Sequence, residues 1–459
     1  MKRMIKILTA TALAVSALVV SSSAASFDHC ADALKTLGLF QGTAQGYELD
    51  RAPTRGEAAT MLVRLLGKEA EAKALTYSAP FTDLDDWQKP YVQYLYENKL
   101  TNGASETTFE PEDKCSAQMY SAFLMRALGY SETSGDFTYD KVIDKAKEIG
   151  LADMANCNET NFLRDNVAAM SYTALAVAPK DKTADTLLDK LVAGGAVDKT
   201  AAASTQKAFQ DYKDYLAVSE TLSKETKMDM SADVSANVKM NGANAMTMTM
   251  PMSIKMDMNM ADMDKSVMAM ATTAKVVMDK ALIGEGQPNE MEMKLEYFYT
   301  NGVYYMSMDG EKIKMPMSFK EIQNQIGTLT TSSSEPLSLI KSISKSGNVY
   351  TVSYEMSAMN GMIQNVLQSM GMDSAALGVD LQLGDVTAKM TVENGKITTM
   401  DMSMAMKMSA EGQSMDMDMT LKCKVNATGD SVKITLPTDL DTYKDMEELL
   451  ASSEATPAA

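Results

Sequence analysis

The chain has 459 residues, 45% hydrophobic and 23% charged, so it is long enough for two or more domains and has a globular composition. A formal net charge of −18 and a pI near 4.7 argue against nucleic-acid partners and anionic membranes, whose phosphates would be repelled. A single histidine, His29, excludes most catalytic triads and histidine zinc sites, and nucleotide-binding motifs are absent from the sequence. We therefore expect no enzyme activity and no cofactor.

Residues 1–25 have the features of a secretory signal peptide. Three basic residues precede an apolar run from Ile7 to Val20, and small residues follow at a plausible cleavage point. The run is too short to cross a bilayer of about 30 Å as a helix. The residues before Cys30 do not form a lipobox, so we expect cleavage without lipid attachment. No later apolar stretch reaches transmembrane length, and retention at the surface would have to come from binding.

The stretch from Tyr47 to Leu66 contains the best-marked helix start. Thr54 stands where an N-cap belongs and Glu57 follows three residues later, which predicts a capping box. The apolar residues after it recur at three- and four-residue spacing, which predicts one buried face and leaves Arg55 exposed in the first turn. An arginine beside free helix-terminal amides can hold an anion, and the alternative is a capped helix with a solvated arginine.

Two later stretches repeat this design of an aromatic entry, a helix, a glycine turn and a second helix. In the stretch from Phe81 to Tyr130 the second helix opens Cys-Ser-Ala-Gln, without the arginine, and we expect Gln118 to act as its third-position cap. The stretch from Phe137 to Ala176 keeps an arginine, Arg164, but not the Thr and Glu of the capping box.

The repeated unit resembles the S-layer homology (SLH) module of Gram-positive surface proteins, and the TRGE of Thr54 to Glu57 resembles that family's hallmark tetrapeptide. The resemblance implies three modules, at residues 27–70, 78–130 and 136–178. It also implies that the modules pack as an all-α pseudo-trimer with ligand grooves between neighbours.

The resemblance further implies a partner, a secondary cell-wall polysaccharide linked to peptidoglycan, often bound through a pyruvate-ketal carboxylate. Arg55 and Arg164 match the family's carboxylate-contacting arginine, whose guanidinium can bind a carboxylate bidentately. Asp83 and Trp87 match its helix-start acid and its sugar-stacking aromatic, although an N-cap and a core residue are the ordinary alternatives. Gly103 matches a glycine that lets backbone approach a ligand. The full set of implied site residues is Thr54, Arg55, Glu57, Asp83, Trp87, Gly103 and Arg164.

Residues 179–225 are rich in Lys, Asp and Ala and carry apolar residues at helical spacing. Gly194 and Gly195 separate two such patterns, so we expect a helical connector of two helices.

Residues 226–446 change to a period of two, with methionine alternating with polar residues, which is typical of half-buried antiparallel strands. The pattern loosely resembles lipoprotein-carrier half-barrels, which implies a curved sheet with helices packed on it. The tail, residues 447–459, is expected to be disordered. Hairpin turns are predicted at Asn301-Gly302, Asp309-Gly310 and Asn394-Gly395, and helical pieces at about 319–329, 336–345 and 361–370.

Of the 42 methionines, 35 lie in this second half. Methionine is flexible and polarizable, so such a face fits an irregular core or an adaptable apolar pocket. Thioether coordination of Cu(I) is the alternative, although a buried strand face already requires the same spacing, and we expect no metal site. The four cysteines lack metal-site spacing, so they are free thiols or contribute one disulfide in the first half: Cys30, Cys115, Cys157 and Cys423.

The sequence thus predicts a multidomain α+β protein. The leading hypothesis is a non-catalytic S-layer or S-layer-associated protein, secreted and anchored to wall polysaccharide, that displays a methionine-rich β domain. The alternative is a wall-located carrier of a lipid or another apolar ligand.

Overall fold

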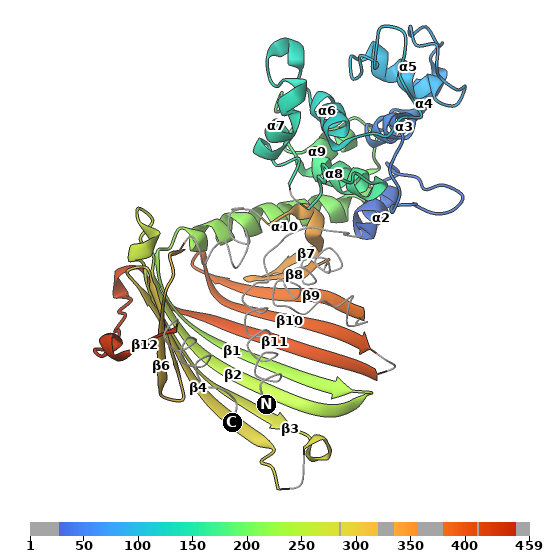
Figure 1. The fold of residues 1–459 in the computed structure, drawn as a ribbon. Coiled ribbons are helices and arrows are strands. Elements are labelled where there is room, and N and C mark those ends of the chain that lie inside the picture. Colours follow the sequence, from blue (N-terminus) through green and yellow to red (C-terminus); the bar gives the residue numbers. More distant parts are fainter. Residues whose placement is uncertain are drawn as a thin grey trace. The chain divides into compact units, whose positions relative to one another are not determined.

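The computed structural model describes residues 27–153, 155–283, 286–319, 335–355, 380–410 and 413–446. The predicted signal peptide, the C-terminal tail and the helix expected at 361–370 lie outside these residues, as does all but the first residue of the helix expected at 319–329. The chain divides into two compact units (Figure 1). The helical unit comprises residues 22–213 and 336–343, and the sheet unit comprises residues 214–335 and 344–459.

The helical unit is built from short amphipathic helices around a core of leucine and aromatic side chains. Leu62, Leu95 and Leu124, from three different helices, are fully buried in it. Helix α2 packs against α8, α6 packs against α7, and α5 packs against α3 and α4. The helices are α2 (Asp28–Thr36), α3 (Arg55–Leu65), α4 (Glu69–Ala74), α5 (Lys89–Glu97), α6 (Ala117–Ala127), α7 (Val142–Glu148), α8 (Arg164–Ala176), α9 (Leu187–Ala193) and the first part of α10 (Lys199–Ser223).

The two helices predicted in the connector are confirmed as α9 and α10, with Gly194 and Gly195 between them. Helix α10 runs on past residue 213 into the sheet unit. All four cysteines are free thiols, and Cys30, Cys115 and Cys157 are buried, so the structure contains no disulfide between them.

The sheet unit is one curved sheet of twelve strands (Figure 1). Its order is β12-β6-β5-β4-β3-β2-β1-β11-β10-β9-β8-β7, and the two end strands do not pair with each other. Strands β12 and β6 are parallel, and the neighbours from β6 through to β8 run antiparallel. The strands are β1 (Lys227–Met240), β2 (Ala243–Asp257), β3 (Val267–Met278), β4 (Glu290–Thr300), β5 (Val303–Met308), β6 (Glu311–Pro316), β7 (Ile340–Ser346), β8 (Val349–Tyr354), β9 (Asp380–Glu393), β10 (Lys396–Ala410), β11 (Gln413–Thr428) and β12 (Lys444–Asp445).

The predicted hairpin turns are confirmed. Asn301-Gly302, Asp309-Gly310 and Asn394-Gly395 all have positive φ at both residues, as a two-residue hairpin turn requires. Asn241-Gly242, which joins β1 to β2, is a fourth turn of this kind that the sequence analysis missed.

The helix expected at residues 336–345 is wrong. The chain forms a short 3₁₀ turn, η5 (Leu337–Leu339), and then strand β7. The apolar spacing there fits a strand next to a hairpin partner as well as it fits a helix, and pairing with β8 decides between them.

One face of the sheet carries the methionines, as their spacing predicted. On the central strand β1 this face has small residues, and the neighbouring strands place methionine on both sides of them. Ala236 lies opposite Met248 of β2 and Met419 of β11, and Val238 lies opposite Met417. Large flexible side chains thus fill the space that small ones leave, which closes the core of the curved sheet.

A buried carboxyl group ties α10 to strand β8 within the sheet unit. Glu335 accepts hydrogen bonds from the hydroxyls of Tyr215 (2.7 Å) and Tyr354 (2.6 Å). Burial raises the pKa of Glu335 above its usual value, although the two tyrosine hydrogen bonds act in the opposite direction.

Glu335 makes the stability of the sheet unit pH-dependent. Because its pKa is higher in the folded than in the unfolded protein, the folded state binds the proton more tightly. The resulting stability is complete below the unfolded-state pKa, about 4.5, and is lost as the pH rises through the folded-state pKa. In Glu335→Gln this loss should be absent.

The measurement is urea unfolding of the mature protein and of Glu335→Gln, monitored by circular dichroism of the sheet. It gives the free energy of unfolding of each protein as a function of pH between pH 4 and pH 8. Parallel pH profiles for the two proteins would contradict the assignment.

Candidate functional site

The start of α3 carries the predicted capping box. The Thr54 hydroxyl accepts a hydrogen bond from the Glu57 amide (3.2 Å), and the Glu57 carboxylate accepts one from the Thr54 amide (2.9 Å). The predicted capping box is therefore confirmed, and these two hydrogen bonds fix where α3 begins.

Glu57 has a second role, as the partner of two arginines. Arg51 binds its carboxylate bidentately, through contacts of 2.6 and 2.9 Å, and Arg164 of α8 lies 3.4 Å from it. Burial alone would raise the pKa of Glu57, but the hydrogen bonds from Arg51 and the Thr54 amide outweigh it, and the pKa is lowered. Arg51 was not predicted from the sequence. Arg51 pairs with both Glu48 and Glu57. The sequence feature that could have identified it is its spacing, three residues after Glu48 and six before Glu57.

Arg55 is buried, not exposed as the spacing predicted; only 6% of its surface is accessible. The start of α3 sits on the loop of residues 109–113. The Arg55 amide donates to the Asp113 carbonyl and the Gly56 amide to the Pro111 carbonyl, both at 2.8 Å. The helix-terminal amides that were expected to be free for an anion are therefore occupied.

The Arg55 side chain lies along the same loop. Its Nε donates to the Phe109 carbonyl (2.8 Å), its Nη1 lies 3.1 Å from the Met119 sulfur, and its Cζ lies 5.0 Å from the centre of the Phe109 ring. Among the described residues, Arg55 forms no ion pair with a carboxylate. A guanidinium so buried and without a counter-charge attracts an anion strongly.

Arg164 is placed in the same way at the start of α8. Its Nε donates to the Tyr47 carbonyl (3.1 Å) and its own amide donates to the Arg51 carbonyl (2.9 Å), so this helix sits on the loop of residues 47–51. Only 3% of Arg164 is accessible. Burial lowers the pKa of its guanidinium, and the nearby Glu57 opposes that effect. The two arginines thus differ in one respect, because Arg164 already has a carboxylate beside it.

The start of α6 has no arginine and carries an open groove instead. Ser116 caps this helix by accepting from the Met119 amide (3.2 Å), so the cap expected of Gln118 is wrong. Gln118 instead donates to the Tyr139 carbonyl (2.8 Å). Ala117 holds the first helical position, where α3 and α8 have arginine. The groove has a volume of about 420 Å³ and is lined by Ser116, Ala117, Gln118, Asp140, Ile143, Asp144 and Glu159.

The other three residues implied by the resemblance are Asp83, Trp87 and Gly103, and each has its own structural role or position. Asp83 is not the cap of a helix; its carboxylate accepts from the amides of Phe109 (2.9 Å) and Glu110 (2.7 Å) and so holds the loop under Arg55. Trp87 is 48% exposed, so the core alternative is wrong for it. Gly103 has φ +78°, and a Cβ there would lie 2.3 Å from the Phe81 ring, so this glycine makes room for a core side chain.

The structure therefore brings Thr54, Glu57 and Arg164 together at the junction of α3 and α8. It places Arg55 at the junction of α3 with the loop of residues 109–113, which Asp83 supports.

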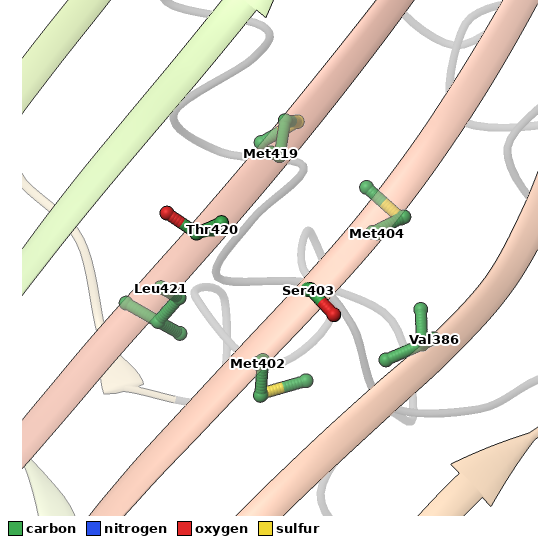
Figure 2. A pocket seen from close by; sticks show the side chains of 7 residues that line it. All are labelled: Val386, Met402, Ser403, Met404, Met419, Thr420 and Leu421. Carbon is green, nitrogen blue, oxygen red and sulfur yellow. The ribbon is translucent and has the colours of Figure 1, made fainter.

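The methionine face of the sheet unit was the other candidate site. Figure 2 shows a hollow lined by Val386 of β9, Met402 and Met404 of β10, and Met419 and Leu421 of β11. Its volume is about 20 Å³, close to the space that one water molecule needs. This hollow is too small for a lipid chain.

Two models of known protein families match parts of the chain. A model described as "Family of unknown function (DUF6612)" matches residues 213–443, just over half of the chain. The chain belongs to this family. The DUF6612 match covers nearly all of the described part of the sheet unit, together with the end of α10, and leaves out the helices that precede residue 199.

A second model, the S-layer homology domain, matches residues 80–116 of this DUF6612 protein. The matched stretch contains Asp83, Trp87, Gly103 and the loop on which Arg55 rests. One SLH domain is therefore recognised within the helical unit.

Three relatives by sequence are much longer proteins. They are the "Middle cell wall protein" of Brevibacillus brevis (29% identical over 147 residues, 31% of this chain and 14% of that protein), the "Surface layer protein" of Brevibacillus choshinensis (25% over 190 residues, 39% and 17%) and an "Endoglucanase" of a Bacillus species (32% over 108 residues, 21% and 12%). The chain spans at most 17% of the length of these relatives. With the SLH domain, the names of the first two support a secreted, cell-surface location for this DUF6612 protein.

Within the described ranges, no group of three or more His, Cys, Asp or Glu side chains is placed to hold a metal ion. No helix in that part of the chain has the length and apolarity needed to cross a membrane.

Gly103 offers a test of the packing around Phe81, whose ring also contacts Phe109. Gly103→Ala should destabilise the helical unit by about 3 kcal/mol, because the new methyl group meets the Phe81 ring and the backbone has a positive φ. Gly135→Ala is the matched control. Gly135 has φ +72° but nothing within 4 Å of the added Cβ, so its cost should be about 1 kcal/mol. Thermal unfolding of both variants gives the comparison, and equal losses would show that Gly103 is not a packing requirement.

Proposed function

We propose that the helical unit attaches the secreted protein non-covalently to an acidic polysaccharide linked to peptidoglycan, with Arg55 as the carboxylate contact. In this proposal the protein is not an enzyme, and the methionine-rich sheet is displayed at the cell surface. The observation that carries the proposal is the Arg55 guanidinium, which is buried to 6% exposure and forms no ion pair among the described residues.

Overall electrostatics make a local contact necessary. The chain has a formal net charge of −18, so its long-range field repels an acidic polymer. A guanidinium with a bidentate geometry can overcome this repulsion at short range, because charge-assisted hydrogen bonds gain strength where water is excluded.

This proposal gives Arg164 a different role from the carboxylate contact that the SLH resemblance implied. Glu57 already lies 3.4 Å from it, and a ligand carboxylate would have to compete with that ion pair. We therefore assign to Arg164 the role of holding α8 against α3, through Glu57, and to Arg55 the role of binding.

We further propose that three modules, at about residues 27–70, 78–130 and 136–178, form a ring. Two contacts support this arrangement: the start of α3 sits on the loop of the second module, and the start of α8 sits on the loop of the first. The groove at the start of α6 would lie at the third junction, between the second and third modules. Trp87 is exposed near the helix start of the second module and is proposed as one aromatic contact for sugar.

The apolar ligand considered for the sheet is not part of this proposal, because the described hollow on the methionine face holds only about 20 Å³.

Sedimentation of the mature protein with peptidoglycan sacculi that keep their polysaccharide tests the proposal. Arg55→Gln should weaken binding by about 30-fold or more, since the ligand carboxylate then lacks its charged partner. Arg164→Gln is the control, because Arg164 is also buried at the first position of a helix and also donates to a loop carbonyl. Its binding should stay close to that of the wild type. Circular dichroism checks that both variants fold.

Sacculi stripped of polysaccharide by mild acid should bind none of the proteins. Equal binding of wild type and Arg55→Gln, or undiminished binding to stripped sacculi, would refute the proposal.

A further inference from the structure

Three methionine side chains meet at the hollow on the methionine face of the sheet. Met402 and Met404 of β10 and Met419 of β11 line it, together with Val386 and Leu421 (Figure 2). The strand register sets Met404 directly opposite Met419, and Met402 opposite Leu421. Opposite residues on one face of an antiparallel pair have Cβ atoms about 5 Å apart, and residues two apart along a strand are separated by about 7 Å. Three thioether groups from two strands therefore border one small space.

The hollow has the size of a single ion. Its volume is about 20 Å³, which is close to that of one water molecule. Ser403 and Thr420 also border it, but the alternation of the strands places their side chains on the opposite face of the sheet. There the Thr420 hydroxyl lies 2.7 Å from the Ser235 hydroxyl. The side chains that face the hollow are therefore thioethers and hydrocarbons.

The hollow lies at the edge of a larger cluster of packed methionines. Packing alone accounts for a methionine face, and a buried strand face already requires the spacing of two, so the sequence gave no reason to expect a metal site. The structure adds that methionines of different strands lie against one another over the small residues of β1. The clustered methionines are Met246, Met248 and Met278 of β2 and β3, and Met404, Met406, Met415, Met417 and Met419 of β10 and β11.

Thioether sulfur is a soft ligand, and soft ligands select Cu(I). Calcium and magnesium require oxygen ligands, and zinc is held by thiolate, imidazole or carboxylate groups. Since the side chains that face the hollow provide none of these groups, the hollow discriminates against the hard and borderline cations.

Charge and access both favour a cation at this place. The chain has a formal net charge of −18, and the exposed carboxylates of Asp401 and Asp418 lie next in the chain to Met402 and Met419. Their field attracts a positive ion towards this part of the sheet. Met419 is buried, with 6% of its surface accessible, but Met402 and Met404 are partly exposed. An ion can therefore reach the sulfurs from the Met402 and Met404 side while the strands stay paired.

We propose that Met402, Met404 and Met419 form a binding site for one Cu(I) ion, coordinated by their three thioether sulfurs. The ion binds and leaves as Cu(I), so no electron is transferred, and no proton is released because a thioether carries none. This site does not depend on the attachment of the helical unit to the wall, and the failure of either proposal leaves the other standing.

Competition with a chromophoric Cu(I) chelator in the absence of oxygen tests the site in the mature protein, with Ag(I) as a second, redox-inert probe. The wild type should bind Cu(I) more tightly than about 1 μM. Met404→Leu and Met419→Leu should each weaken binding about tenfold or more, because leucine keeps the volume and removes one of three ligands. The matched control is Met248→Leu. Met248 is buried to 4% exposure in the same cluster but does not line the hollow, so this variant should bind within about twofold of the wild type.

Cysteine thiols also bind Cu(I), so their contribution is measured separately. Cys423 is the one cysteine of the sheet half, and Cys423→Ser should bind within about twofold of the wild type. Cys30, Cys115 and Cys157 are buried and contribute equally to all of these proteins. Urea unfolding checks that each variant keeps its fold.

Three results would each overturn the proposal: a wild type that binds no tighter than about 1 μM, a Met404→Leu variant that binds as tightly as Met248→Leu, or loss of binding in Cys423→Ser, which would assign the metal to the thiol.

Discussion

The chemistry of the helical unit depends on the docking of the start of α3 onto residues 109–113. Two helix-terminal amides, those of Arg55 and Gly56, are used in this contact. The helix terminus is thereby satisfied, and the Arg55 side chain is drawn into the interface, where it donates to the Phe109 carbonyl. The same contact buries the Arg55 guanidinium, which strengthens its attraction for an anion. It also occupies the Arg55 and Gly56 amides, which could otherwise bind an anion themselves.

A comparison of α3 with α8 shows how a small difference in surroundings separates two similar arginines. Both helices begin on a neighbouring loop, and both arginines donate through Nε to a loop carbonyl. Only Arg164 lies near Glu57, whose carboxylate also holds Arg51 and the Thr54 amide. One carboxylate thus stabilises the cap of α3, the loop before it and the start of α8, whereas Arg55 has no carboxylate partner among the described residues.

Features that depend on near neighbours in the chain could be predicted from the sequence. The Thr54–Glu57 capping box, the Asn-Gly and Asp-Gly hairpins and the methionine face of the sheet all follow from spacings of two, three or four residues. Features that depend on contacts between distant segments could not. The burial of Arg55, the clamp of Asp83 on the Phe109 and Glu110 amides, and the place of Gly103 against Phe81 each need the packed structure. Strand β7 was mistaken for a helix for the same reason, since its identity is set by its partner β8.

The central claim is that an external carboxylate meets Arg55 and not Arg164. Guanidinium NMR can measure this directly, because the chain has only six arginines and all of them precede residue 165. The side-chain Nε–H resonances are followed while the released wall polysaccharide is added to the mature protein. We expect the Arg55 resonance to shift with saturation while those of Arg51 and Arg164 stay in place. A shift of Arg164 without Arg55, or no shift of either, would contradict the account.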